Sequence, residues 1–91
     1  MYEWDEEKKR QNEIKHGLSF EDVDAVFDGL CLTFRDTRER YDEAHFITIG
    51  FLKERMVVIA HTPRGEKIRI ISMRKANSRE QKNYQKRFET S

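Results

Sequence analysis

The sequence predicts an α+β fold in which helices pack on one four-stranded antiparallel sheet, in the order ααββββα. Four segments rich in β-branched and aromatic residues, at 31–35, 46–52, 56–62 and 67–73, are typical of strands. Capped helical segments precede and follow them, and short turns join the last three strands into an antiparallel meander. The length of 91 residues leaves room for a single domain over 1–91.

The first helix is predicted from Asp5 to His16. Asp5 is a good N-cap, and Glu6 and Glu7 then lie in the first turn, where the helix dipole favours negative charge. Gly17 suits the left-handed position that ends a helix.

A second helix is predicted to begin at Ser19, with Asp22 at the third helical position, and to end at Gly29. Its acidic and apolar residues lie on different faces, so we expect an acidic amphipathic helix that covers the sheet. The apolar residues at helical spacing are Phe20, Val23, Val26 and Phe27.

The strands that follow are separated by one charged loop and two turns. Residues 36–44 show no periodicity and form the loop, and residues 53–55 form the first turn. Pro63 and Gly65 suit the second and fourth positions of a type I turn, which exposes Arg64 at a hairpin tip. The sequence does not decide which face of the last strand would bind a ligand, because strict alternation places apolar residues on both faces. It places Arg69, Ile71 and Met73 on one face, and Ile68, Ile70, Ser72 and Arg74 on the other.

The last helix is predicted to start at Asn77 or Ser78. Glu80 or Gln81 would then complete a capping box. The helix and the preceding strand present many cations and one tyrosine, a composition suited to phosphate binding. These residues are Arg69, Arg74, Lys75, Arg79, Lys82, Tyr84, Lys86 and Arg87.

The net charge of +1 conceals a strong polarity along the chain. Residues 1–45 contain 7 Lys and Arg against 13 Asp and Glu, a balance of −6, and residues 46–91 contain 11 against 4, a balance of +7. A basic flank that faces a polyanion and an acidic flank that faces a basic protein would explain this, as would attraction between the two halves. With one cysteine, Cys31, and no apolar N-terminal run, we expect a cytoplasmic protein without a disulfide, signal peptide or membrane span.

Over nearly its whole length the chain resembles the BrnT family of ribonuclease toxins. The resemblance is carried by an ordered set of residues at family-like spacing, and His45 departs from it, since an arginine is more usual there. The matching residues are Trp4, Asp5, Asn12, Lys15, His16, Gly17, Phe20, Glu21, Val26, Phe27, Asp36, Arg38, Tyr41, Glu43, Ile49, Gly50, Arg69, Ile70, Ile71, Ser72, Met73, Arg74, Ala76, Glu80 and Tyr84.

The resemblance implies a RelE-like fold and a type II toxin that cleaves RNA without a metal or other cofactor. It also implies neutralisation by a small antitoxin, BrnA, in a heterotetramer that binds operator DNA through the antitoxin. Cleavage of messenger RNA would block translation.

The residues themselves are compatible with this chemistry. RNA can be cut by its own 2′-hydroxyl, so the protein must supply a proton acceptor, a proton donor and cations that stabilise the phosphorane. We predict Arg64, Arg74 and Arg79 as these cations around one cleft. Further contacts to RNA are predicted from Lys67, Arg69, Lys75 and Lys82.

For proton transfer the candidates are His61, Glu80 and Tyr84, each with a structural alternative. His61 is either a catalytic imidazole or a polar residue at a strand end. Glu80 is either catalytic or part of the capping box, and Tyr84 either anchors the last helix or stacks on a base.

Other polar residues receive a structural interpretation first. The three histidines lack zinc-ligand spacing, so no metal site is predicted. The arginines of the charged loop either pair with neighbouring acids or contact a partner; they are Arg35, Arg38 and Arg40. Two other function classes stay open: a module that binds RNA or DNA without cutting it, and a scaffold for transcriptional autoregulation with the antitoxin.

Overall fold

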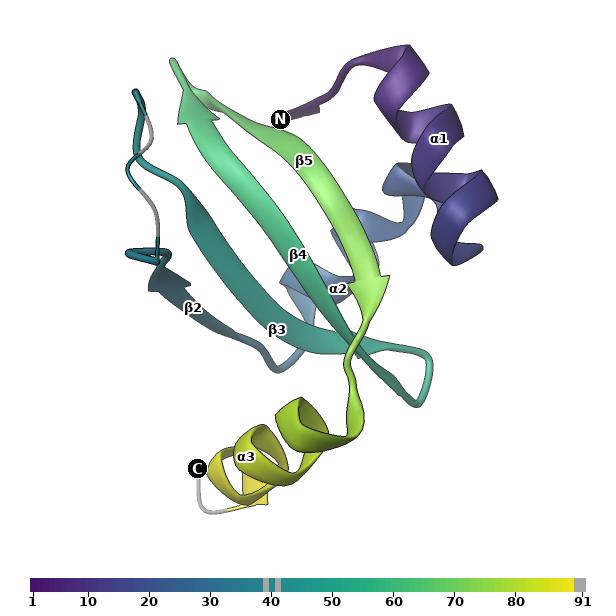
Figure 1. The fold of residues 1–91 in the computed structure, drawn as a ribbon, viewed down its shortest axis with the longest axis vertical. Helices are drawn as coiled ribbons and strands as arrows, with labels where there is room; N and C mark the ends of the chain where they lie inside the picture. Colours follow the sequence, from purple (N-terminus) through teal and green to yellow (C-terminus); the bar gives the residue numbers. More distant parts are fainter. Residues whose placement is uncertain (39, 41, 90–91) are drawn as a thin grey trace.

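The computed structural model describes residues 1–38, 40 and 42–89 (Figure 1). Within these residues no helix is long and apolar enough to cross a membrane. The elements, in chain order, are β1 (Tyr2–Glu3), α1 (Glu6–His16), the 3₁₀ helix η1 (Phe20–Asp22), α2 (Val23–Asp28), β2 (Leu32–Arg35), β3 (Phe46–Leu52), β4 (Arg55–Arg64), β5 (Lys67–Lys75) and α3 (Ser78–Glu89).

The sheet has five strands in the order β1-β5-β4-β3-β2 and is mixed, so the predicted four-stranded antiparallel sheet and the order ααββββα are wrong. Strands β2 to β5 form the expected antiparallel meander, and β1 adds to β5 in parallel. Tyr2 lies opposite Ile68 and Glu3 opposite Arg69, and the Ile68 N–H donates to the Met1 carbonyl. Two residues are too short for a periodic signal, and their partners are far along the chain.

The helix boundaries follow the local signals closely. The Asp5 side chain accepts a hydrogen bond from the Lys8 N–H, and Gly17 ends α1 with a φ of 69°. Ser19 caps η1 instead of an α-helix, so the predicted second helix begins with a 3₁₀ turn and becomes α-helical at Val23. The strand β4 extends beyond its predicted range, from Arg55 to Arg64.

Helices cover both faces of the sheet. In Figure 1 α2 lies behind the sheet and α3 lies below its lower end. The core on the α1 and α2 face contains Phe20, Val23, Val26, Val57, Ile59, Ile70 and Met73. The smaller core beside α3 contains Ile47, Ile49, Met56, Val58, Ala76 and Phe88.

A bulge in β5 resolves which side chains share a face. Ala60 pairs with Ser72 but His61 pairs with Ile70, so Ile71 is the extra residue. The bulge changes the phase, and Ile70 and Met73 therefore share the core beneath α1 and α2, where strict alternation had separated them. Arg74 then lies on the other face, towards α3.

The Asn12 side chain fixes α1 to the edge of β5 that β1 leaves open. Asn12 is 7 % exposed, and its Nδ2 donates to the carbonyls of Met73 (2.8 Å) and Leu18 (3.2 Å). Its Oδ1 accepts from the Met73 N–H at 3.1 Å. The amide thus satisfies both backbone groups of Met73, as a neighbouring strand would.

We expect Asn12→Ala to lower the free energy of unfolding by about 2–3 kcal/mol, because it strips buried backbone groups of their partners. Denaturant unfolding measures this loss. The matched control is Gln11→Ala, which removes an exposed amide one position earlier on α1. Equal stability of the two variants would contradict the role of Asn12.

Candidate functional site

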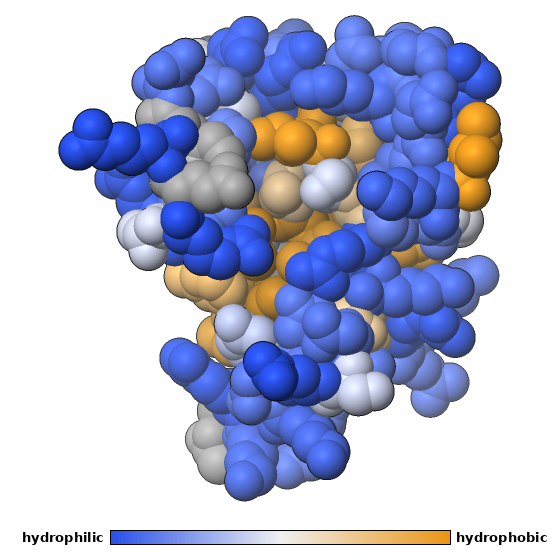
Figure 2. Space-filling view, viewed as in Figure 1, coloured by the Kyte–Doolittle hydropathy of each residue, from blue (hydrophilic) through white to orange (hydrophobic). Residues whose placement is uncertain are grey.

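A pocket of about 280 Å³ lies on the α3 face of the sheet, between β2 with its following loop, the sheet and α3. Apolar side chains are visible in the middle of this face, surrounded by a polar rim (Figure 2). The volume suits one nucleotide unit better than a folded RNA. The lining residues are Phe34, Arg35, Asp36, Thr37, Arg38, Ile47, Ile49, Val58, Arg74, Glu80 and Tyr84.

Arg74 stands at the end of β5, opposite Val58, and is held by Glu80 from the first turn of α3. Its Nη1 and Nη2 each donate to one Glu80 carboxylate oxygen at 2.8 Å. This bidentate geometry fixes the plane of the guanidinium. Hydrogen bonding to Arg74 lowers the pKa of Glu80, so the carboxylate is ionised at neutral pH.

Glu80 also completes the capping box. Its Oε1 accepts from the Asn77 N–H at 2.9 Å, and the Asn77 side chain accepts from the Glu80 N–H at 2.8 Å. The predicted cap is confirmed with Asn77 as the capping residue. One carboxylate therefore both starts α3 and positions Arg74.

A second arginine and carboxylate pair lies in the loop after β2. Arg38 donates from Nε at 2.9 Å and from Nη2 at 3.0 Å to Asp36, which is 8 % exposed, while the Arg38 side chain is 74 % exposed. Hydrogen bonding to Glu80 raises the pKa of Arg74, and the Arg38 charge acts in the opposite direction. Both guanidinium groups line the same pocket.

Aromatic side chains form a third wall of the pocket. The Tyr84 ring of α3 stacks on Phe34 of β2, with centroids 6.0 Å apart and an angle of 11°. Tyr84 therefore anchors α3 to β2, as one of its two interpretations predicted. Phe34 is 39 % exposed, so this pair also offers a ring face at the pocket rim.

The three predicted arginines do not meet in one cleft. Arg64 lies at the far end of β4, six residues or about 20 Å from the residue opposite Arg74, and pairs with Glu43 at 3.5 Å. Arg79 is exposed on the first turn of α3 and lies outside the described lining of the pocket. Of the predicted catalytic residues, the structure brings together Arg74, Glu80 and Tyr84.

His61 lies on the opposite face of the sheet, beneath α2. It is 6 % exposed, its Nε2 is 2.7 Å from the Thr48 hydroxyl, and its ring contacts those of Phe27 and Phe46. Burial lowers its pKa to about 4. This environment favours the structural interpretation of His61 over the catalytic one, and its hydrogen-bond partner is the Thr48 side chain.

The predicted RNA contacts are spread along the molecule. Lys67 lies at the β4–β5 turn, and Arg69 pairs with Glu3 at 2.8 Å beside β1. Lys75 directly follows Arg74, and Lys82 is exposed on α3.

Sequence reasoning did not place Phe34, Asp36 and Arg38 in the site. Asp36 and Arg38 form an ion pair, as one interpretation of the charged loop predicted. Their place beside Arg74 in one pocket depends on the folding of distant segments, which the sequence does not indicate. The available signal for Asp36 and Arg38 was their place among the family-like residues, a set that does not include Phe34. Tyr41, another of those, lies outside the described residues.

The fold and the pocket define a small α+β protein that gathers arginines, carboxylates and aromatic rings beside its terminal helix. The model of a family described as "Ribonuclease toxin, BrnT, of type II toxin-antitoxin system" matches residues 4–80, most of the chain. The chain therefore belongs to the BrnT family of ribonuclease toxins, and the resemblance is confirmed. Membership in a type II system implies an antitoxin partner. The comparison with curated proteins finds no match.

The buried imidazole predicts a pH dependence of stability. The unfolded chain takes up a proton at His61 near pH 6.5, whereas the folded chain does so only near its pKa of about 4. Stability is thus full above pH 6.5 and falls as pH drops towards 4, by about 3 kcal/mol in total. Denaturant unfolding at several pH values should show a smaller loss for His61→Gln. An identical pH profile for this variant would exclude the His61 contribution.

Proposed function

We propose that this toxin is a metal-independent endoribonuclease that cleaves messenger RNA by attack of the 2′-hydroxyl, and that Arg74 binds the cleaved phosphate. It acts in the cytoplasm, where it blocks translation, and a BrnA-type antitoxin neutralises it in a heterotetramer that binds operator DNA through the antitoxin. The observation that carries the proposal is the bidentate Arg74–Glu80 pair facing Arg38 across one pocket.

The paired guanidinium groups suit a phosphate that gains charge during the reaction. Each is oriented by a carboxylate before RNA arrives, so little reorganisation is needed in the transition state. A guanidinium has five N–H donors; in Arg74 two bind Glu80 and one donates from Nη1 to the Lys75 carbonyl at 3.4 Å, so two remain for phosphate oxygens. The Arg38 side chain is 74 % exposed and that of Arg74 is 35 % exposed, so both are accessible to an anion from solvent.

Glu80 is the proposed proton acceptor. It is ionised, lines the pocket and lies beside Arg74. Phosphate competes for the Arg74 donors, so binding of RNA weakens the interaction that lowers the Glu80 pKa and makes the carboxylate a better base. The Tyr84 hydroxyl is the proposed donor to the leaving oxygen, and the exposed Phe34 ring of the Phe34–Tyr84 pair is the proposed stacking surface for a base. Arg64 and Arg79 would contact RNA outside this pocket.

We expect Arg74→Ala to reduce RNA cleavage by about 10² to 10³-fold, because it removes charge stabilisation at the phosphorane. The assay incubates purified protein with total RNA in excess EDTA. Lys8→Ala is the matched control, since it removes one exposed cation on α1, on the other face of the sheet.

Cleavage by the unchanged protein and by Lys8→Ala, but not by Arg74→Ala, supports the proposal. Full activity of Arg74→Ala would refute the site. No cleavage by any form would favour ribosome-dependent cutting or the alternative, a module that binds nucleic acid without cutting it.

Glu80→Gln separates chemistry from helix capping. Glutamine can still accept the Asn77 N–H, so we expect the thermal midpoint to change little, while cleavage falls at least 10²-fold and RNA binding is retained. Asn77→Ala is the converse control: it removes the cap at a cost of about 1 kcal/mol and should keep cleavage. Cleavage that survives in Glu80→Gln would exclude Glu80 as the base.

A further inference from the structure

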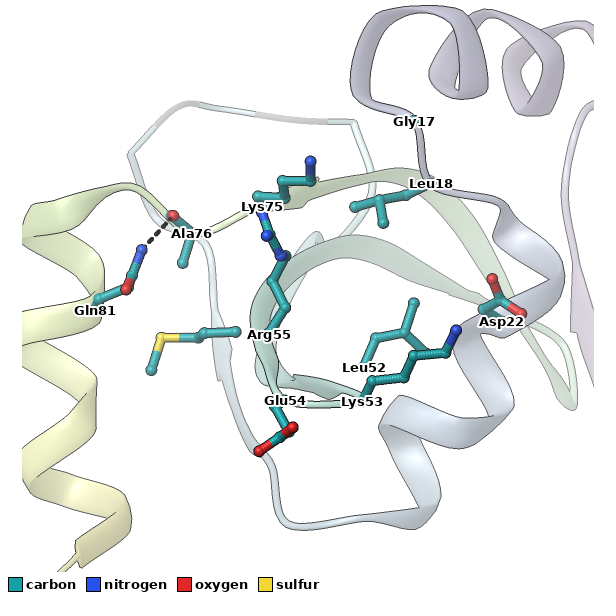
Figure 3. A pocket seen from close by; sticks show the side chains of 11 residues that line it. Gly17, Leu18, Asp22, Leu52, Lys53, Glu54, Arg55, Lys75, Ala76 and Gln81 are labelled. Carbon is teal, nitrogen blue, oxygen red and sulfur yellow. Dashed lines mark hydrogen bonds between the residues drawn. The ribbon is translucent and has the colours of Figure 1, made fainter.

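A hollow of about 830 Å³ lies at the end of the sheet where β3 turns into β4 (Figure 3). It is bounded on one side by the end of α1 and the start of α2, and on the other by the start of α3. Of its lining residues, only Lys75 has been given a functional role so far, as a predicted RNA contact. Leu18, Leu52, Met56 and Ala76 supply the apolar part of its lining.

Three cations enter this groove from separate points of the chain. Lys53 and Arg55 come from the β3–β4 turn and Lys75 from the end of β5, and Figure 3 shows the three around one hollow. In the part of the chain that the structure describes, none of the three has a carboxylate within ion-pairing distance, in contrast to Arg74. Two acids, Asp22 and Glu54, also line the groove, which leaves an excess of positive charge.

Lys53 occupies a backbone conformation that does not favour a lysine. Leu52 pairs with Arg55, so Lys53 and Glu54 form a two-residue turn in which Lys53 has a φ of 59°. Glycine is the residue that adopts this region without steric cost. Lysine therefore gives this turn no conformational advantage, and its side chain extends from the turn towards Asp22 at one side of the groove (Figure 3).

The groove adjoins the Arg74 pocket. Lys75 of β5 and Gln81 of α3 line the groove. The residues that directly precede them in the chain, Arg74 and Glu80, line the pocket. The Gln81 side chain donates to the Ala76 carbonyl at 3.0 Å and so joins the start of α3 to the end of β5, at the divide between the groove and the pocket. An RNA strand whose phosphate lies on Arg74 can cross the divide and enter the groove.

We infer that the groove formed by Lys53, Arg55 and Lys75 is a second RNA subsite, which binds the phosphate backbone next to the cleaved bond. The inference rests on the proposed function for its substrate and adds Lys53 and Arg55 to the binding surface. Cations that hold phosphates without touching the reacting atoms increase affinity for long RNA and make it salt-dependent.

The test measures binding of fully 2′-O-methylated RNA, which cannot be cleaved, by fluorescence anisotropy at several salt concentrations. Oligomers of about 3 and about 12 nucleotides are compared; the longer one lies within the range of site sizes known for single-strand binders and the shorter one lies below it. The variants are Lys53→Gly, Lys53→Arg and Arg55→Ala, with Lys8→Ala as the control. Lys53→Gly removes the charge and suits the backbone, so its thermal midpoint should equal or exceed that of the unchanged protein.

For the long oligomer we expect Lys53→Gly and Arg55→Ala to weaken binding and to reduce the slope of log affinity against log salt by about 0.7 each. Lys53→Arg should restore both, and the short oligomer should bind all forms equally. An unchanged slope and affinity for the long oligomer in both variants overturns the inference. Because this RNA cannot be cut, the result is independent of cleavage, which the EDTA assay tests separately.

Discussion

The edge of β5 is the constraint on which the rest of the structure depends. This strand carries the bulge, two core residues, Arg74 and the connection to α3, yet β1 covers only two of its positions. Asn12 supplies the missing partner at Met73 and thereby joins α1 to the strand that ends at the pocket. The direction in which Arg74 points therefore depends on an amide from α1, which packs against the edge of β5.

Beyond the end of β5, three further contacts shape the pocket in which we place the chemistry. Glu80 starts α3 and orients Arg74, Asp36 orients Arg38, and the Phe34–Tyr84 stack closes the space between β2 and α3. Each contact stabilises the fold and also prepares the pocket. A cation that is already fixed needs no rearrangement when charge develops on a phosphate, which is the main advantage of such a site over flexible lysines.

What could be predicted from the sequence was local. The Asp5 cap, the Gly17 stop and the Asn77–Glu80 box depend on residues within a few positions, so they were visible. The pairing of β1 with β5 and the bulge at Ile71 depend on contacts between distant segments and carry no periodic signal. For the same reason Arg74, Glu80 and Tyr84, which lie within one strand-to-helix unit, come together, whereas Arg64 and His61 lie elsewhere.

The central claim is that the pocket around Arg74 holds the RNA phosphate. The most direct measurement is an NMR titration of the assigned protein with a short, fully 2′-O-methylated RNA, which cannot be cleaved. We expect the amide shifts to concentrate in residues 34–38 and 74–84, with the largest changes at the Arg74 and Arg38 side chains. Shifts confined to the Arg64 tip or to α1, with these groups unmoved, would contradict the claim.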